Sequence, residues 1–128
     1  MQYEYFYGAQ AEQFSFYRIP KALFTEPNFR ELSTDAKVLY GILLDRMSLS
    51  LKNQWLDAQN KVYIIFTVDE IMDALNCANQ KAARLMVELE KQAGLIERKR
   101  QGLGRPNLIY VKNFAATING KSCEKGDS

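Results

Sequence analysis

The feature that most constrains the fold is a short helix, a tight turn and a longer helix followed at once by two strands. Thr67 and Glu70 form a capping-box pattern, in which each side chain can satisfy the other residue's backbone amide. The pattern predicts a short helix over 68–75. Residues 76–79 favour a turn, and apolar residues then recur at helical spacing over 79–93. Two helices joined in this way predict a helix-turn-helix unit.

The segment after this unit predicts a β-hairpin. Gly94 suits the left-handed end of the second helix. Residues 95–100 and 107–112 are rich in strand-forming side chains, and the glycine-rich stretch 101–106 separates them. A helix-turn-helix followed by a hairpin is typical of the winged helix, in which the hairpin is the wing. We therefore expect an α+β, mainly helical, winged helix-turn-helix fold with a C-terminal β-hairpin wing.

Upstream residues predict a long helix and a third strand. Ser33 is a suitable N-cap and Asp35 lies favourably in the first turn. Apolar side chains then share one face up to Met47, so the helix should end near 48–51. Residues 62–66 are β-branched and aromatic, which favours a strand.

Charge is unevenly distributed along the chain. The formal net charge is +2, from 17 basic and 15 acidic residues. Residues 1–77 carry a net −3, residues 78–112 a net +5, and residues 113–128 are neutral. The basic third of the chain coincides with the second helix and the wing. This distribution indicates binding to a polyanion such as DNA.

The phosphates and base edges of double-stranded DNA each favour particular side chains, which identify the candidate contact residues. Amide and guanidinium groups at the front of a recognition helix can contact base edges, while basic groups on a wing can bind phosphates. Because neighbours on a strand point to opposite faces, one alternative turns Lys99 away from the DNA. The predicted DNA-binding residues are Asn79, Gln80, Lys81, Arg84, Arg98, Lys99, Arg100, Arg105 and Asn107.

The composition argues against an enzyme. The chain has no histidine, which excludes Ser-His and Cys-His catalytic pairs and histidine metal ligands. Cys77 and Cys123 fit neither a metal motif nor a disulfide framework, so we expect reduced thiols. No signal peptide or membrane-spanning stretch is apparent. We expect a cytoplasmic, non-catalytic protein without a metal or cofactor and without membrane contact.

The first 17 residues hold nearly half of the 15 aromatic side chains. Their alternation with polar residues predicts an extra N-terminal strand or hairpin segment, turning near 8–10. Exposed aromatics could stack on single-stranded bases, but the acidic Glu4 and Glu12 favour a self-association surface instead. We therefore expect a homo-oligomer, a dimer or higher. The predicted oligomerisation residues are Tyr3, Tyr5, Phe6, Tyr7, Phe14, Phe16 and Tyr17.

Several motifs together resemble one known family. They span roughly residues 14–115: the stretch from Phe16 to Lys21, the long helix from Leu32 to Arg46, Val62-Tyr63-Ile64, the stretch from Glu70 to Glu97, and Gly102-Leu103-Gly104-Arg105-Pro106-Asn107. In these motifs the chain resembles the N-terminal domain of the plasmid replication initiator protein A family (RepA_N) of Gram-positive bacteria. The resemblance implies a domain that binds iterons, the repeated sequences of a plasmid origin.

The resemblance also implies a division into parts. We expect residues 1–17 to be an aromatic oligomerisation segment, 18–115 the winged-helix domain, and 116–128 a polar tail leading to a C-terminal domain that recruits host replication proteins. The main alternative is a scaffold similar to the primosomal DnaD proteins, which assembles with proteins and has no sequence preference on DNA. A transcriptional repressor of the same fold is a third possibility.

Overall fold

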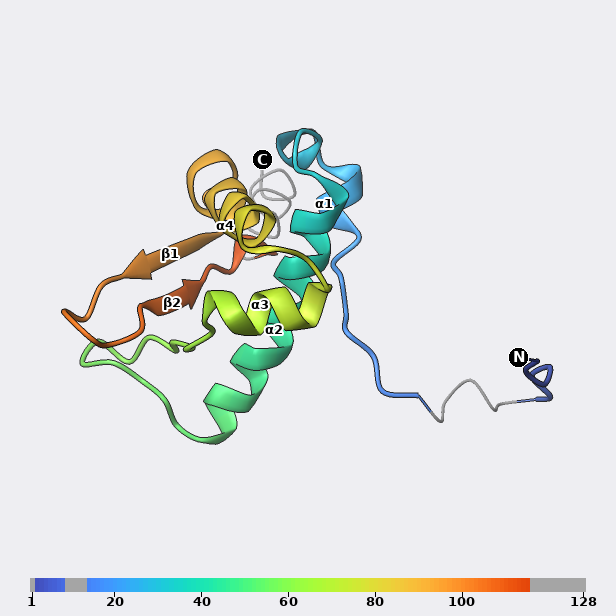
Figure 1. The fold of residues 1–128 in the computed structure, drawn as a ribbon, viewed down its shortest axis with the longest axis horizontal. Helices are drawn as coiled ribbons and strands as arrows, with labels where there is room; N and C mark the ends of the chain where they lie inside the picture. The colour runs from blue at the N-terminus through green and yellow to red at the C-terminus, as the bar shows by residue number, and fades with distance from the viewer. Residues whose placement is uncertain (1, 9–13, 116–128) are drawn as a thin grey trace, which may run out of the picture.

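Three helices and a two-stranded hairpin form the folded body (Figure 1). The structure is a computed structural model and describes residues 2–8 and 14–115. The helices are α2 (Thr34–Lys52), α3 (Val68–Leu75) and α4 (Asn79–Val87), preceded by the short α1 (Ala22–Thr25) and the 3-10 turn η2 (Pro27–Phe29). The element order confirms the winged helix-turn-helix.

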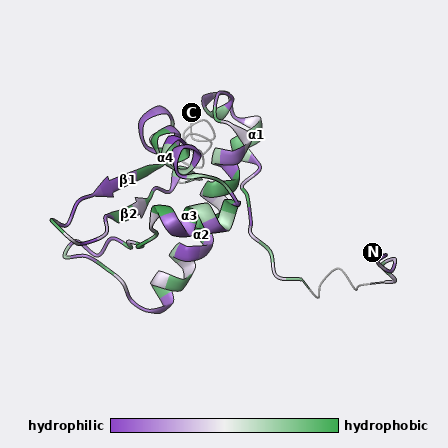
Figure 2. Ribbon diagram, viewed as in Figure 1, coloured by the Kyte–Doolittle hydropathy of each residue, from purple (hydrophilic) through white to green (hydrophobic). Residues whose placement is uncertain are grey.

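Helix α2 is the central element of the body. It starts at the expected N-cap, where the Ser33 hydroxyl accepts a hydrogen bond from the Ala36 amide at 3.1 Å. Its inner face is fully buried, including Leu39, Tyr40 and Leu43. Hydrophobic and hydrophilic residues alternate around this helix and around α3 (Figure 2). The helix extends to Lys52, slightly further than the sequence predicts.

A glycine in the middle of α2 lets the incoming chain cross the helix. A Cβ atom at Gly41 would lie 2.9 Å from both the Arg18 carbonyl oxygen and a side-chain carbon of Ile19. Glycine in a helix interior destabilises the helix by about 1 kcal/mol relative to alanine. The close crossing of residues 18 and 19 explains why it is present.

The helix-turn-helix unit forms as expected at its start and differs at its end. Thr67 and Glu70 make the reciprocal capping box, and α3 has the predicted bounds. Helix α4 starts at Asn79 but ends at Val87, where a π-helical turn, η3 (Glu88–Gln92), takes over. Glu88 and Leu89 are both buried in the π turn.

The wing is an antiparallel pair of short strands, β1 (Ile96–Lys99) and β2 (Leu108–Val111), with Arg98 opposite Ile109. The strand predicted over 62–66 is reduced to single bridges. Val62 pairs with Leu56, whereas Ile64 pairs with Ile109 of β2. These residues pair with different partners, so no continuous ladder forms.

The expected N-terminal strand or hairpin is absent from the described part of that segment. Residues 2–7 and 15–17 adopt neither helix nor strand, and their aromatic side chains are exposed. Alternation alone cannot form a strand here, because an extended segment needs a neighbouring strand for its backbone hydrogen bonds. Residues 9–13, which include two residues of the turn predicted at 8–10, and the tail 116–128 with Cys123 lie outside the described residues.

Candidate nucleic-acid interface

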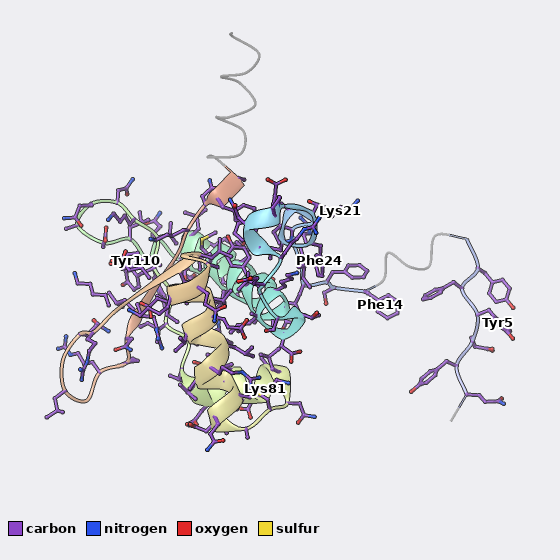
Figure 3. The ribbon with its side chains drawn as sticks, turned by 90° about the horizontal axis from the view of Figure 1, so that it is seen from above. Tyr5, Phe14, Lys21, Phe24, Lys81 and Tyr110 are labelled. Atoms are coloured by element: carbon purple, nitrogen blue, oxygen red, sulfur yellow. The ribbon has the colours of Figure 1, made fainter. Side chains whose placement is uncertain are left out.

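The front of α4 presents three of the predicted contact residues to solvent. Asn79, Gln80 and Arg84 are exposed, while Ala82 and Met86 are buried on the opposite face. Lys81 behaves differently, because its ammonium forms a 2.7 Å ion pair with Asp35 in the first turn of α2. About two fifths of the Lys81 side chain is nevertheless exposed, at the end of α4 labelled in Figure 3.

The N-terminus of α4 has no side-chain cap. Its N-cap is Ala78, whereas α2 and α3 begin with the side-chain caps Ser33 and Thr67. The first amides of a helix point outward and carry partial positive charge, which favours phosphate when no side chain satisfies them. The first turn of α4 also carries no acidic residue. This end of the helix therefore suits an anionic partner.

The tip of the wing carries the other exposed candidates. Lys99, Arg100, Arg105 and Asn107 are all exposed. The tip is ordered by a hydrogen bond from the Gln101 side-chain amide to the Pro106 carbonyl at 2.9 Å. Gly102 and Gly104 adopt positive φ angles of 119° and 78°, which L side chains rarely adopt. The tip therefore presents basic side chains on a glycine-dependent turn.

Arg98 is positioned differently from its basic neighbours. Its guanidinium lies 2.8 Å from Glu90 in η3, and its backbone amide donates to the same carboxylate at 3.1 Å. Burial raises the pKa of Glu90, but the hydrogen bonds and positive charge of Arg98 outweigh it and hold that pKa below its usual 4.5. Arg98 thus joins the base of the wing to the end of the recognition helix.

A second carboxylate of η3 fixes the other side of this turn. Glu88 is 8% exposed and accepts hydrogen bonds at 2.9 Å from both the backbone amide and the hydroxyl of Ser33. Ser33 is itself the N-cap of α2. The turn after the recognition helix is therefore held to α2 by Glu88 and to the wing by Glu90. Neither the contact of Glu88 with Ser33 nor that of Glu90 with Arg98 is apparent from the sequence.

The recognition helix and the wing meet across a shallow groove. Its lining includes Thr67 and Val68 at the start of α3, Met86 of α4, and Arg105 and Asn107 of the wing. The groove brings three of the predicted wing contacts, Arg98, Arg105 and Asn107, next to the helix-turn-helix unit. Part of the predicted wing surface thus lies beside the helix-turn-helix unit, whereas the predicted contacts on α4 do not line this groove.

A short loop hairpin supports β2, the second strand of the wing. The Tyr110 hydroxyl of β2 donates to Asp57 at 3.0 Å, and Asp57 also accepts from the backbone amides of Gln59 and Lys61. The hydrogen bond from the Lys61 amide is the main cause of a lowered pKa at Asp57. Trp55 stacks on Tyr63 in the same hairpin, so its ring packs against the protein.

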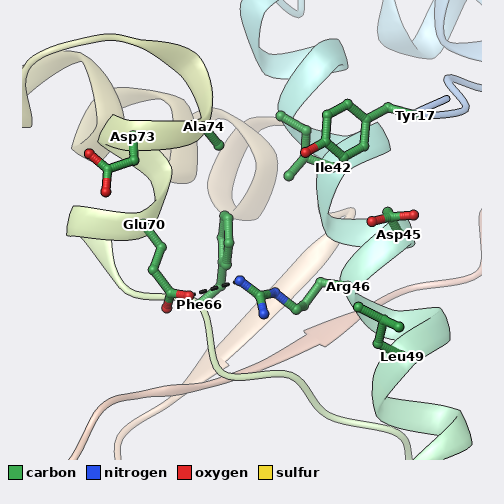
Figure 4. A pocket seen from close by; sticks show the side chains of 9 residues that line it. All are labelled: Tyr17, Ile42, Asp45, Arg46, Leu49, Phe66, Glu70, Asp73 and Ala74. Carbon is green, nitrogen blue, oxygen red and sulfur yellow. Dashed lines mark hydrogen bonds and ion pairs between the residues drawn. The ribbon is translucent and has the colours of Figure 1, made fainter. Parts of the chain in front are cut away.

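The pocket between α2 and α3 contains an ion pair (Figure 4). Arg46 forms a 2.8 Å ion pair with Glu70, and its guanidinium lies 4.8 Å from the centre of the Phe66 ring. Glu70 also completes the capping box of α3. We interpret this cluster as a structural link between the two helices, since its charged groups are engaged with one another.

Neither a metal centre nor a membrane span emerges from the described part of the chain. Within residues 2–8 and 14–115, no group of three or more acidic or cysteine side chains could hold a metal ion. No helix in the same ranges is long and apolar enough to cross a membrane.

The fold and the exposed basic surface define a winged-helix domain of the DNA-binding type. The chain matches the family described as "Replication initiator protein A (RepA) N-terminus" over residues 15–125. It belongs to that family, as its motifs predict. A 41 kDa protein of Lactobacillus helveticus is 32% identical over 103 residues. That match covers 80% of this chain and 28% of the relative, so the chain spans less than a third of the relative's length.

Three solved structures are similar over nearly the whole chain. The N-terminal domain of a DNA binding protein is 35% identical with a TM-score of 0.72, covering 99% of this chain and 98% of its own. A Rep–DNA complex is 34% identical with a TM-score of 0.71, covering 98% of both chains. An MDR initiator is 37% identical with a TM-score of 0.67, covering 93% of this chain and 98% of its own.

Proposed function

We propose that this chain binds the iterons of a plasmid origin in double-stranded DNA, with α4 in the major groove and the wing on the backbone. The observation that carries the proposal is that the front of α4 and the wing tip both expose polar and basic side chains, and that the wing lies beside the helix-turn-helix unit across one groove. Nearby acidic groups do not oppose it, because Glu88 and Glu90 are engaged with Ser33 and Arg98. The similarity to a Rep–DNA complex supports binding to DNA.

The contacts divide by chemistry. Gln80 and Arg84 are suited to base edges, since an amide can bond adenine and a guanidinium can bond guanine with two hydrogen bonds each. Lys99, Arg100 and Arg105 are suited to phosphates, with Asn107 beside them. The ion pairs of Lys81 and Arg98 give those two residues a positioning role in addition to any contact with DNA.

The proposed role requires no catalytic step, and binding to plasmid DNA places it in the cytoplasm. The domain would occupy the origin while host replication proteins are recruited through a C-terminal domain of a longer protein. A primosomal scaffold is less favoured, because the matched family is one of replication initiators. A repressor would be distinguished by the location of the bound site.

Self-association through the N-terminal segment is a separate proposal. Tyr3, Tyr5 and Tyr7 are each at least 70% exposed, and Phe14 contacts the rings of Phe6 and Phe16. Figure 3 shows Tyr5 away from the folded body. Aromatic surface of this kind is typical of protein interfaces. Deleting residues 1–13 should lower the number of chains per particle obtained from light scattering, and an unchanged number would contradict the proposal.

The base-reading role of Arg84 can be tested with a charge-matched control. Duplexes selected from a random library provide the site, and Arg84→Ala should cost about 1–3 kcal/mol of discrimination on that duplex. The control variant Lys21→Ala removes the same charge from the start of α1. Figure 3 shows that Lys21 lies well away from Lys81 of α4. We expect little change for this control. An equal loss on selected and scrambled duplexes would instead make Arg84 a phosphate contact.

A further inference from the structure

The outer face of α4 contains apolar as well as polar side chains. Gln80, Ala83, Arg84 and Val87 are all exposed, and their spacing of three and four residues places them on one face of the helix. Val87 is 43% exposed although it is β-branched and apolar. Two of the four residues facing a DNA groove therefore have only methyl groups to offer.

The core of the fold does not include these two side chains. The inner face of α4 is formed by Ala82, Leu85 and Met86, which are all buried in the core. Valine is a weaker helix former than lysine, glutamate or glutamine, any of which could occupy an exposed position. The side chain at position 87 thus lies outside the core and does not favour the helix.

The major groove offers a specific partner for an exposed methyl group. The C5-methyl of thymine is the apolar group by which direct readout distinguishes thymine in that groove. We propose that Ala83 and Val87 contact thymine methyl groups, and so determine sequence specificity together with Gln80 and Arg84. This inference depends on the proposed function, because it requires α4 to enter the major groove.

The helix geometry also predicts the spacing of the thymines. Ala83 and Val87 are one turn apart, a rise of about 6 Å along α4. Base pairs are stacked about 3.4 Å apart. A helix lying along the groove therefore places the two contacts about two base-pair steps apart. The small side chain of Ala83 allows the helix backbone to approach the bases closely.

The test changes the DNA and leaves the protein intact. Each thymine of the selected duplex is replaced in turn by deoxyuridine, which lacks the methyl group, and affinity is measured by fluorescence anisotropy with the 128-residue chain. We expect about a fourfold loss at one or two positions, the effect of one buried methyl group. Losses at two positions should lie about two base pairs apart.

A protein variant links one of these positions to Val87. In Val87→Ala, the loss on replacing the cognate thymine should fall below about twofold, because the partner methyl groups are gone. Leu51→Ala, an apolar truncation at a more exposed position near the end of α2, should retain the full effect. A thymine effect that is the same in the chain and in Val87→Ala would overturn the Val87 contact.

The outcomes separate this inference from the proposed function. Specific binding without any dependence on thymine methyl groups would overturn the inference and leave the proposed function standing. Selection that recovers no preferred sequence would overturn both. If Val87→Ala instead lowered the mass of the DNA-free chain in light scattering and left the thymine effect unchanged, Val87 would belong to an interface between copies.

Discussion

Glu90 accepts hydrogen bonds from both the backbone amide and the guanidinium of Arg98, at 3.1 and 2.9 Å. The pair is largely buried, with 16% and 28% of the two side chains exposed. It joins the π turn after the recognition helix to the first strand of the wing. The relative position of α4 and the wing, which we propose to face the DNA, therefore depends on this pair, and Arg98 differs in its contacts from the exposed basic residues of the wing.

We predict that Arg98 contributes more to stability than to phosphate binding. Arg98→Ala should lower the free energy of unfolding by about 2 kcal/mol, because it removes charge-assisted hydrogen bonds from a largely buried carboxylate. It should leave the salt dependence of DNA binding nearly unchanged. Urea unfolding and anisotropy titrations at several salt concentrations measure the two effects.

The exposed neighbour Arg100 is the matched control. Arg100→Ala should leave stability within about 0.5 kcal/mol of the unchanged chain. It should reduce the slope of log K against log salt by about 0.9, the value for one lost phosphate contact. If Arg98→Ala reduced the slope and Arg100→Ala did not, the two roles would have to be exchanged.

The Glu90 pair also predicts a dependence of stability on pH. Because the folded pKa of Glu90 lies below its usual 4.5, ionised Glu90 stabilises the fold above about that pH. This contribution is lost as the pH falls through the lowered pKa. The stability difference between the chain and Glu90→Gln should therefore shrink between pH 5 and pH 3, as measured by urea unfolding. A difference that stays constant over this range would contradict the assignment.

The uncapped start of α4 predicts opposite effects on stability and binding. Ala78→Asp supplies the missing cap and should raise the free energy of unfolding by about 1 kcal/mol. It also places a carboxylate where we expect a phosphate, so DNA affinity should fall. Ala78→Ser supplies a cap without charge and should stabilise the fold with a smaller loss of affinity. Unchanged affinity in Ala78→Asp would exclude this helix end from the interface.

Tyr40 predicts a stability effect at alkaline pH. Its hydroxyl donates to the Lys112 carbonyl at 2.8 Å, and burial raises the pKa of Tyr40 from 10.0 to about 12. Its contribution is therefore complete below about pH 10 and is lost as the pH rises through about 12. Tyr40→Phe should cost about 1 kcal/mol or more at neutral pH, because the carbonyl loses its donor.

The exposed Tyr5 provides the control for this prediction, since Tyr5→Phe should not change the free energy of unfolding. In a titration followed by phenolate absorbance, the last tyrosine to ionise should be missing in Tyr40→Phe. Loss of an early-ionising tyrosine instead would show that Tyr40 is accessible to water.

Much of the fold could be predicted because its boundaries are set by local signals. The caps at Ser33 and at Thr67 with Glu70 lie within three residues of the amides they bind, so they are visible in sequence. Gly94 adopts the positive φ of 65° that its place after the helix implies. The family resemblance was confirmed by the match over residues 15–125.

The remaining features depend on partners distant in sequence. Ser33 and Glu88 are 55 residues apart, and Tyr40 and Lys112 are 72 apart, so no spacing rule connects them. Helical periodicity over 79–93 could not reveal that α4 ends at Val87 and that η3 (Glu88–Gln92) continues it as a π turn. The close crossing at Gly41 does have a signal in the sequence, because a glycine inside a long helix indicates a close backbone approach.

The most direct test of the central claim compares affinities for selected and scrambled duplexes. Fluorescence polarisation at about 150 mM salt, close to physiological ionic strength, measures both with the same chain. The proposed mode of binding predicts a preference of about 10³ or more for the selected sequence. Equal affinity for the two duplexes would contradict sequence-specific recognition by α4 and favour a scaffold without sequence preference.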